Sequence, residues 1–190
     1  MIFGATGLSL SLTAPGLSQQ ISVLRPRIEE AIRSISTQSG NFIQIDATSG
    51  YGEAGSFHIS RPGLLRFEYN ERPETLIADG THVARVNRQN GSVSRVRLRA
   101  TPLRIILSED VDLTNGVTIT TMEQTPDSLF VTMYETGKRD QGLITVFLDV
   151  NTYDLRGWKI DESDGNITTV ILQDTQSGLP LDQSLFEIPS

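Results

Sequence analysis

Residues 55–80 read GSFHISRPGLLRFEYNERPETLIADG and carry a clear strand pattern. Its apolar side chains recur at every second position on both sides of an Arg-Pro-Gly break: Phe57, Ile59, Leu65, Phe67 and Tyr69. A period of two places such side chains on one face of an extended strand. Turn-forming residues follow at 70–73 and again at 78–80. The stretch therefore predicts antiparallel strands joined by tight turns.

The same alternation continues toward the C-terminus, at Val83 and Arg85, at Val117 and Ile119, and at Leu129, Val131 and Met133. Further turn signals lie at 89–91, 115–116, 136–137 and 164–165. Counting the segments between such signals predicts about nine to eleven strands. Segments 143–148 and 167–172 alternate less cleanly, which is typical of strands covered on both faces. We expect one long, highly curved antiparallel sheet.

Two segments instead have a helical pattern. Between residues 23 and 36 the apolar positions are spaced by three and four, which places them on one helical face: Leu24, Ile28, Ala31, Ile32 and Ile35. Pro26 has no amide proton and is tolerated best in a first turn, so we predict that this helix begins near Pro26 and ends at Gly40.

The second helical segment is short and unusually apolar. Thr101 is the expected N-cap and Pro102 the expected first helical residue, followed by Leu103, Ile105, Ile106 and Leu107. Together the patterns predict a fold that is mainly β with some α, with the helices against one side of the sheet. A concave sheet covered by apolar helices encloses either an ordinary core or a ligand cavity, and periodicity leaves both open.

The length of 190 residues favours a single domain, which we assign to residues 21–190. Residues 1–20 are apolar, small and uncharged, and we interpret them as a signal-peptide remnant or a flexible N-terminal tail. No run approaches the roughly 18 to 20 apolar residues of a membrane-spanning helix. We therefore expect a soluble mature domain.

Composition excludes several classes of function. The chain has 16 basic and 23 acidic residues, and the net charge of -7 argues against nucleic acid as a partner. It has no cysteine, which excludes disulfides, thiolate catalysis and lipidation of a cysteine. Its two histidines stand apart from other ligand-type residues, so we expect no metal site.

We identify no catalytic residue, expect no cofactor, and predict that the chain is not an enzyme. A hydrolase would need a nucleophile, a base and a residue that orients the base. His58 and Ser60 would share one face of a strand, but the sequence offers no third member of such a group.

The residues from Gly55 to Tyr69 resemble the signature of the LolA family of outer-membrane lipoprotein carrier proteins, G-x-F-x-[IL]-x-R-P-x-x-[LIF]-R-[FW]-x-Y. The family's I-x-D-G strand is matched at 77–80, and its T-P-x-x-L-L segment resembles residues 101–107. Residues 155–169 resemble its C-terminal hairpin and 181–186 its terminal segment. The resemblance covers residues 24–189 in the same order as in the family.

This resemblance implies an unclosed (half) antiparallel β-barrel with a helical lid over a hydrophobic cavity. It also implies a periplasmic carrier of acylated lipoproteins, which receives them from an inner-membrane lipoprotein-releasing ABC transporter and delivers them to an outer-membrane lipoprotein acceptor. Transfer of cargo directly from the opening of one carrier to that of the next suits a monomer. The alternative is a related carrier or sensor of another lipid or of a glycolipid in the cell envelope.

The resemblance also assigns roles to residues. Arg61 matches the arginine that latches the barrel to the lid; by itself it reads as an exposed strand arginine. Leu64, Leu65 and Phe67 fall where the family contacts cargo or transporter. The lid and cavity candidates, which could equally be plain core, are Leu24, Ile28, Ile32, Ile35, Leu103, Ile105, Ile106 and Leu107. Arg85 departs from the family, which often has an aromatic residue there, and this leaves the cargo preference open.

Overall fold

The computed structural model describes residues 16–47 and 49–189. Its strands form one antiparallel sheet in the order β6-β5-β4-β3-β2-β1-β11-β10-β9-β8-β7. Their bounds are β1 Thr37–Asp46, β2 Gly52–Ser60, β3 Leu64–Tyr69, β4 Glu74–Asp79, β5 His82–Asn87, β6 Val93–Arg97, β7 Val117–Gln124, β8 Ser128–Glu135, β9 Leu143–Asp149, β10 Leu155–Asp161 and β11 Ile167–Ser177. The strand count and the mainly β fold class are confirmed.

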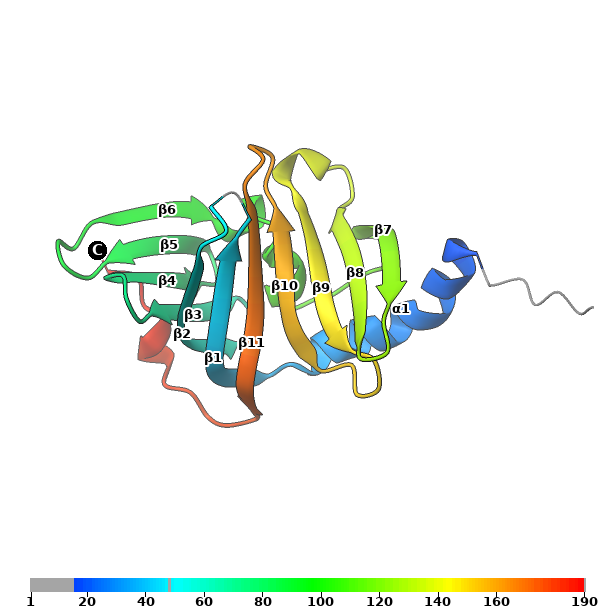
Figure 1. Ribbon diagram of the computed structural model, residues 1–190, viewed down its shortest axis with the longest axis horizontal. Helices are drawn as coiled ribbons and strands as arrows, with labels where there is room; N and C mark the ends of the chain where they lie inside the picture. Colours follow the sequence, from blue (N-terminus) through cyan, green and yellow to red (C-terminus); the bar gives the residue numbers. More distant parts are fainter. Residues whose placement is uncertain (1–15, 48, 190) are drawn as a thin grey trace, which may run out of the picture.

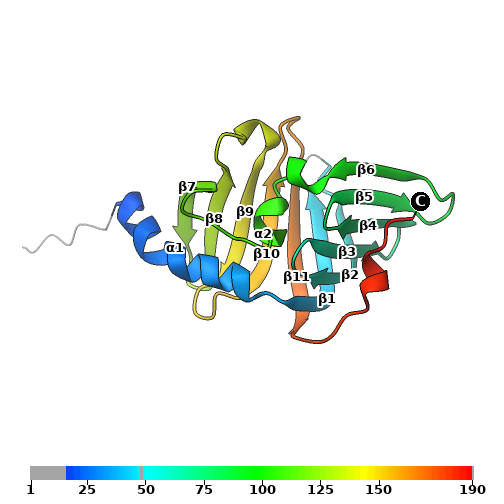
Figure 2. The same ribbon diagram turned by 180° about the vertical axis from the view of Figure 1, so that it is seen from behind.

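The sheet consists of two meanders that meet where β1 pairs with β11 (Figure 1). One meander runs outward from β1 to β6, and the other returns from β7 to β11. Strands β6 and β7 are the two edges, so the barrel does not close, as expected. Figure 2 shows helix α1 and the small helix α2 on the concave side of the curved strands.

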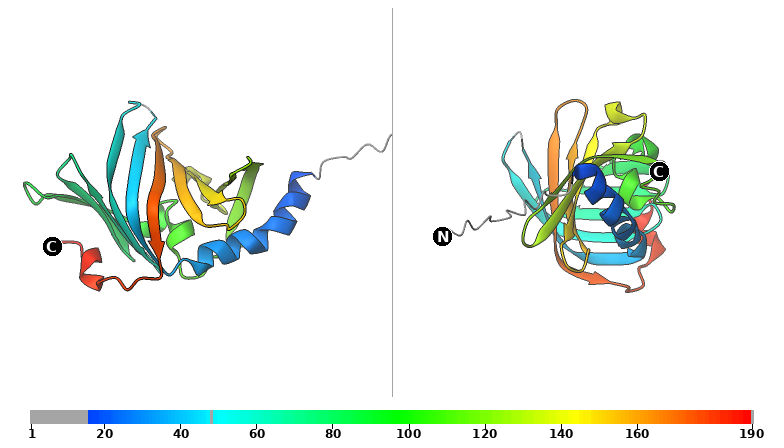
Figure 3. Two further views of the ribbon diagram at one scale, coloured as in Figure 1. Left: turned by 60° about the horizontal axis from the view of Figure 1, so that its bottom comes forward. Right: turned by 90° about the vertical axis from the view of Figure 1, so that its right-hand side faces the viewer.

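Helix α1 spans Leu17–Ser34, so the prediction that it begins near Pro26 and ends at Gly40 is wrong at both ends. Pro26 lies inside the helix, and both it and Ser22 are exposed. Water can therefore bond to the Ser22 carbonyl that Pro26 leaves without a donor. A proline inside a helix bends it, and α1 is visibly bent in Figure 3.

Gly40 lies within β1, next to a register shift between Ser39 and Asn41 in the pairing with β11. A Cβ atom at Gly40 would lie 2.6 Å from the Gln173 carbonyl oxygen. The glycine is thus required by the close approach of two strands at a bulge, where a side chain would collide with the neighbouring backbone.

Helix α2 spans only Arg104–Leu107 and is preceded by a 3-10 helix, η1, at Leu98–Ala100. Thr101 is not its N-cap, because its hydroxyl donates backward to the Leu98 carbonyl at 2.9 Å. The chain enters α2 through a tight turn in which the Arg104 amide donates to the Thr101 carbonyl at 3.2 Å. The predicted helix is therefore present, but it starts later.

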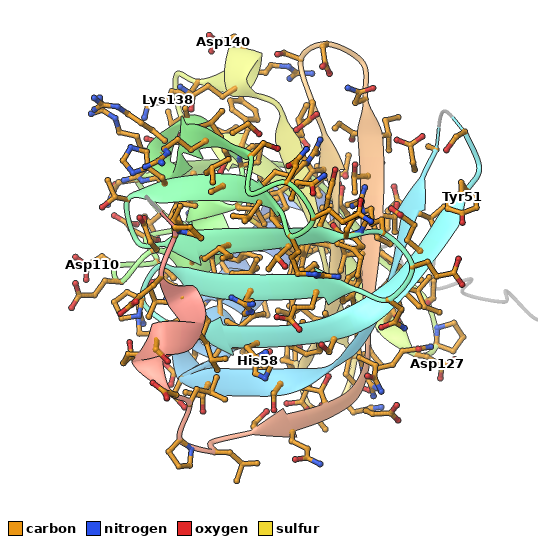
Figure 4. The ribbon with its side chains drawn as sticks, turned by 90° about the vertical axis from the view of Figure 1, so that its left-hand side faces the viewer. Tyr51, His58, Asp110, Asp127, Lys138 and Asp140 are labelled. Carbon is orange, nitrogen blue, oxygen red and sulfur yellow. The ribbon has the colours of Figure 1, made fainter. Side chains whose placement is uncertain are left out.

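Of the two strands expected to be covered on both faces, β9 is the more completely buried, although Leu143 and Phe147 on its outer face are only half-buried. Ile144, Thr145 and Val146 are consecutive buried residues, whereas in β11 Ile171 is 38% exposed between two buried neighbours. The C-terminal segment covers another part of the outer face. Its 3-10 helix η3, Gln183–Phe186, packs against β3 and β4, and Figure 4 shows it over the outer side of the sheet.

The expected N-terminal tail lies largely outside the described residues, and α1 begins within its last four positions. Among the described residues, no helix combines the length and the apolar character needed to span a bilayer.

Candidate functional site

The concave face of the sheet is an apolar wall. Alternation along β3 turns Leu65, Phe67 and Tyr69 inward, and all three are buried. Phe67 stacks on Phe42 with ring centroids 4.2 Å apart and lies 5.8 Å from the Trp158 ring. Aromatic pairs at such distances add to the stability that apolar burial supplies. The wall is therefore a packed surface built from distant parts of the chain.

A helical lid, defined here as α1 and α2 with their flanking residues, lies on this wall. Ile28 and Ile32 of α1 and Ile106 and Leu107 of α2 are almost fully buried in the same apolar cluster as the wall. The structure brings all eight predicted lid and cavity residues together: Leu24, Ile28, Ile32, Ile35, Leu103, Ile105, Ile106 and Leu107.

Arg61 stands at the end of β2 and connects both parts of the lid to the sheet. One guanidinium nitrogen donates to the carbonyl of Ile32 in α1, and the other donates to the carbonyl of Ser108, directly after α2. The planar guanidinium suits such a bridge because its donors point in fixed directions. Burial lowers the pKa of Arg61, and the nearby Arg33 adds to the effect. The side chain is not an exposed strand arginine.

Sequence reasoning missed three further contacts that hold the lid. Arg33 of α1 donates to the Val111 carbonyl at 3.0 Å, and the Gly63 amide donates to the Leu107 carbonyl at 2.7 Å. Arg104 lies 2.5 Å from a carboxylate oxygen of Glu135 at the end of β8. Each contact joins residues far apart in the chain, so no local pattern could reveal it.

The three residues predicted to contact cargo or transporter separate into two groups. Leu65 is 0% exposed and Phe67 1% exposed, and both line the interior. Leu64 alternates to the other face of β3 and is half-buried. Leu65 and Phe67 are therefore placed for contact with something inside the barrel, and only Leu64 is partly accessible from outside.

A cavity of about 400 Å³ remains between the β3–β6 side of the wall and strands β10 and β11. This volume lies within the range of about 300 to 1,000 Å³ that is usual for small-molecule sites. Its apolar lining comprises Leu65, Phe67, Leu76, Val83, Leu103, Trp158, Ile160 and Val170. Polar side chains also line it, among them Gln44, Arg85, Ser94, Glu162 and Thr168.

Arg85 is the cationic residue at this cavity that the sequence singled out. Its side chain is 63% exposed and its Nε lies 3.6 Å from a carboxylate oxygen of Glu74. Deeper in, the Tyr69 hydroxyl donates to Gln44 Oε1 at 2.7 Å, and burial raises the pKa of Tyr69. The cavity therefore has an apolar interior with a polar, partly charged margin.

His58 lies away from this cavity, on the outer face of the sheet (Figure 4). Burial lowers its pKa, and its Nδ1 has no hydrogen-bond partner among the described residues. Among residues 16–47 and 49–189, no group of three or more acidic or histidine side chains is placed to hold a metal ion. The arrangement around His58 and Ser60 thus lacks the hydrogen-bonded base that a serine nucleophile requires.

One solved structure that is similar to this chain supports this architecture at the level of the fold. A crystal structure of a DUF1329 family protein from Desulfovibrio piger superposes with a TM-score of 0.55 at 7% identity, over 91% of this chain and 98% of that one. A LolA superfamily protein from Nitrosomonas europaea gives a TM-score of 0.48 at 8% identity, over 86% of this chain and 97% of that one. No curated protein sequence matches closely enough to count as a relative.

The family comparison is more specific than the likeness to the Desulfovibrio piger protein, which shows the fold alone. The sequence model of a protein family, described as outer membrane lipoprotein carrier protein LolA, matches residues 33–189. This range includes the Arg61 segment, both edges of the sheet and α2, and it confirms the resemblance inferred from the sequence. The chain belongs to the LolA family.

Proposed function

We propose that this protein is a periplasmic carrier of acylated lipoproteins. It would take them from an inner-membrane lipoprotein-releasing ABC transporter, shield their acyl chains, and deliver them to an outer-membrane acceptor, working as a monomer and without catalysis. The observation that carries the proposal is the bridge made by Arg61, which holds two apolar helical segments over one apolar wall. Family membership supports the same role.

The physical need for such a carrier comes from the acyl chains. Each methylene that leaves water is worth about 0.8 kcal/mol, so an acylated protein does not cross an aqueous space unaided at a useful rate. The wall beneath the lid, with Leu65, Phe67 and Trp158 facing inward, offers the apolar surface that would replace water around the chains.

Loading requires the lid to move. The free cavity of about 400 Å³ is only part of the barrel interior, because the side chains of Ile28, Ile32, Ile106 and Leu107 fill the rest. Acyl chains and lid side chains would therefore compete for the same wall. Such an exchange keeps the free and loaded states close in free energy, which a carrier needs in order both to bind and to release.

Arg61 would bias this exchange toward the closed state. Its two hydrogen bonds join the sheet to α1 and to the end of α2, so both depend on the lid lying in place. Loss of the guanidinium removes stabilisation from the closed, empty protein while leaving the apolar wall intact. A protein without this latch should hold its cargo longer.

The test is native mass spectrometry of protein purified from the periplasm, with extraction and identification of the bound molecules. Wild type is compared with Arg61→Leu, and Arg61→Lys serves as the control that keeps the charge but not the planar fork. We expect acylated lipoprotein or its lipid in all samples and the highest occupancy in Arg61→Leu. An empty cavity in every sample, with Arg61→Leu indistinguishable from wild type, would sink the proposal.

A second candidate is a carrier or sensor of another lipid or a glycolipid. The polar margin of the cavity favours it, because Gln44, Arg85 and Ser94 could bond to a head group attached to an acyl chain. The same extraction separates the two functions: a diacylglyceryl-cysteine peptide identifies lipoprotein cargo, whereas a glycolipid or phospholipid identifies the second candidate.

A further inference from the structure

The charge of the chain is unevenly distributed. Residues 85–104 contain six arginines and no aspartate or glutamate, in a protein whose net charge is -7. This run includes the edge strand β6 and continues through η1 to the start of α2. Such a segment creates a local positive potential on an otherwise acidic molecule.

Three of these arginines meet at a hollow of about 570 Å³ in the surface: Arg97, Arg99 and Arg104. The sheet contributes the β2–β3 turn at Pro62 and Gly63 and the β4–β5 turn at Gly80 and Thr81, while the lid side contributes Leu107, Ser108 and Glu109. Glu109 is the one acidic residue in this lining. We call this hollow the arginine hollow.

Two of the three cations of the arginine hollow are available to a ligand. Arg97 and Arg99 are exposed, and neither forms an ion pair with another described residue. Arg104 pairs with Glu135, which Lys138 also contacts at 2.7 Å. The cluster is therefore not neutralised within the protein, and like charges held together favour an anionic occupant.

We propose that the arginine hollow, together with the adjoining edge of β6, docks an acidic, extended segment of a partner protein. Strand β6 pairs only with β5, so its other side presents backbone donors and acceptors to an incoming strand. Carboxylates on that strand would reach Arg97 and Arg99. An anionic bilayer is a poorer fit, because the rest of the chain is strongly acidic and would be repelled by a broad negative surface.

The position of the hollow couples docking to the lid. Its lining contains both fixed turns of the sheet and residues of α2, and Ser108 is also the residue whose carbonyl accepts a hydrogen bond from Arg61. A partner bound there contacts the sheet and the lid at once, so its affinity depends on whether the lid is closed. By linkage, partner binding shifts the lid equilibrium by the same factor. This docking role rests on the proposed carrier function, since a carrier needs a partner that opens it.

The experiment measures fluorescence anisotropy of a fluorescein-labelled peptide of alternating Glu and Thr, titrated with the full chain at low salt. The test variant is Arg97→Gln/Arg99→Gln, which leaves the Arg104–Glu135 pair in place. The control variant is Arg27→Gln/Arg139→Gln, which makes the same change in net charge at exposed arginines elsewhere. Circular dichroism checks that each variant is folded.

We expect the test variant to bind the peptide about two- to thirtyfold more weakly than wild type, the range for the loss of two exposed ion pairs. The control should bind like wild type, and Arg61→Leu should change the affinity of an otherwise intact hollow. Equal weakening in test and control variants would overturn the proposal, since only net charge would then matter. So would preferential binding to vesicles of phosphatidylglycerol and phosphatidylcholine with no binding of the peptide.

Cargo occupancy, measured by native mass spectrometry on the same proteins, keeps the two proposals separable. Normal cargo with no binding of the peptide removes the docking role and leaves the carrier function standing. Binding of the peptide at the arginine hollow by a protein with an empty cavity removes the carrier function instead.

Discussion

The wall and the lid enclose the same apolar interior but are held in different ways. The wall is a continuous ladder of eleven hydrogen-bonded strands whose inner face is locked by stacked aromatic rings. The lid presents aliphatic side chains, and the polar contacts that hold it are few, with Arg61 and Arg33 supplying three of them. A molecule built this way can release its lid while the wall keeps its shape.

The largest expected effect comes from the wall. Phe67 packs against Phe42, Phe57 and Trp158, so Phe67→Ala removes a ring from the centre of the aromatic cluster. We expect the free energy of unfolding to fall by about 3 to 5 kcal/mol, measured by urea denaturation. Phe67→Leu, which keeps most of the volume, should lose clearly less; equal losses would mean that ring packing does not secure the wall.

A truncation in the lid should cost less than its burial suggests. Ile32 is completely buried, and Ile→Ala at such a site usually costs about 2 to 5 kcal/mol. If the lid opens as proposed, the loss is limited by the free energy that closes it, because the protein can then open while the wall stays intact. Hydrogen exchange should accelerate in α1 in Ile32→Ala and stay unchanged in β3. Faster exchange throughout the sheet would mean that wall and lid unfold as one unit.

Loss of the contact between Arg33 and the Val111 carbonyl should lower the stability of the closed lid by a smaller amount again. Arg33→Gln removes the hydrogen bond to the Val111 carbonyl, worth about 0.5 to 1.5 kcal/mol, which exists only when α1 is in place. It also removes ion pairs with Glu29 and Glu30 within the helix, and exposed pairs of this kind contribute about 0.3 to 0.5 kcal/mol each. The expected result is faster hydrogen exchange in α1 at nearly unchanged resistance to urea. Arg27→Gln on the same helix is the matched control, and an identical change in both variants would point to helix propensity rather than closure.

The smallest effect is expected at a turn of the wall that is remote from the lid. Asp149 accepts hydrogen bonds from the Thr152 amide, from the Arg156 side chain and from the Asn151 amide, and these hold its pKa well below the usual 3.8. A depressed folded-state pKa stabilises the protein above the unfolded value, and this stabilisation is lost as the pH falls toward the folded one. Asp149→Asn should therefore lower the melting temperature at pH 7.

The pH dependence sharpens that prediction. Below pH 3.8 the carboxylate of the unfolded chain becomes protonated while the folded-state carboxylate, with its lowered pKa, stays charged. The stabilisation that Asp149 supplies is lost in this window, so the difference in melting temperature between wild type and Asp149→Asn should shrink. Cargo retention should be the same in both proteins at pH 7. A difference that persists or grows in acid would assign the effect to the shape of the side chain and not to its charge.

The wall was more predictable from sequence than the lid because its signals are local. Alternation within a few residues places Leu65 and Phe67 on one face without knowledge of any other strand. The sequence places the start of α1 too late because a proline inside a helix normally loses a backbone hydrogen bond. Only the fold shows that the turn around Pro26 faces water, which can replace that bond. The sequence alone indicates a helix end at Gly40, because the close contact of Gly40 with Gln173 lies across the sheet and leaves no local signal.

The lid contacts and the arginine hollow depend on residues that only the fold brings together. Arg61 reaches carbonyls 29 and 47 positions away in sequence, and nothing near Arg61 but the family pattern pointed to them. The arginines at 97, 99 and 104 are visible as a basic run, but the hollow also needs the turns at 62–63 and 80–81. The sequence therefore gives the number of arginines in this segment, but only the fold shows that three of them lie at one hollow.

The link between the two edge strands sets a limit on how the barrel can widen. Strand β6 ends at Arg97 and β7 begins at Val117, and the residues between them, which include α2, cross the concave side (Figure 2). This connection is a tether of fixed contour length, since each residue spans at most about 3.3 to 3.6 Å. The distance between the two edge strands and the position of α2 are therefore coupled. A cargo wide enough to push the edges apart would also pull on the connecting segment and displace α2.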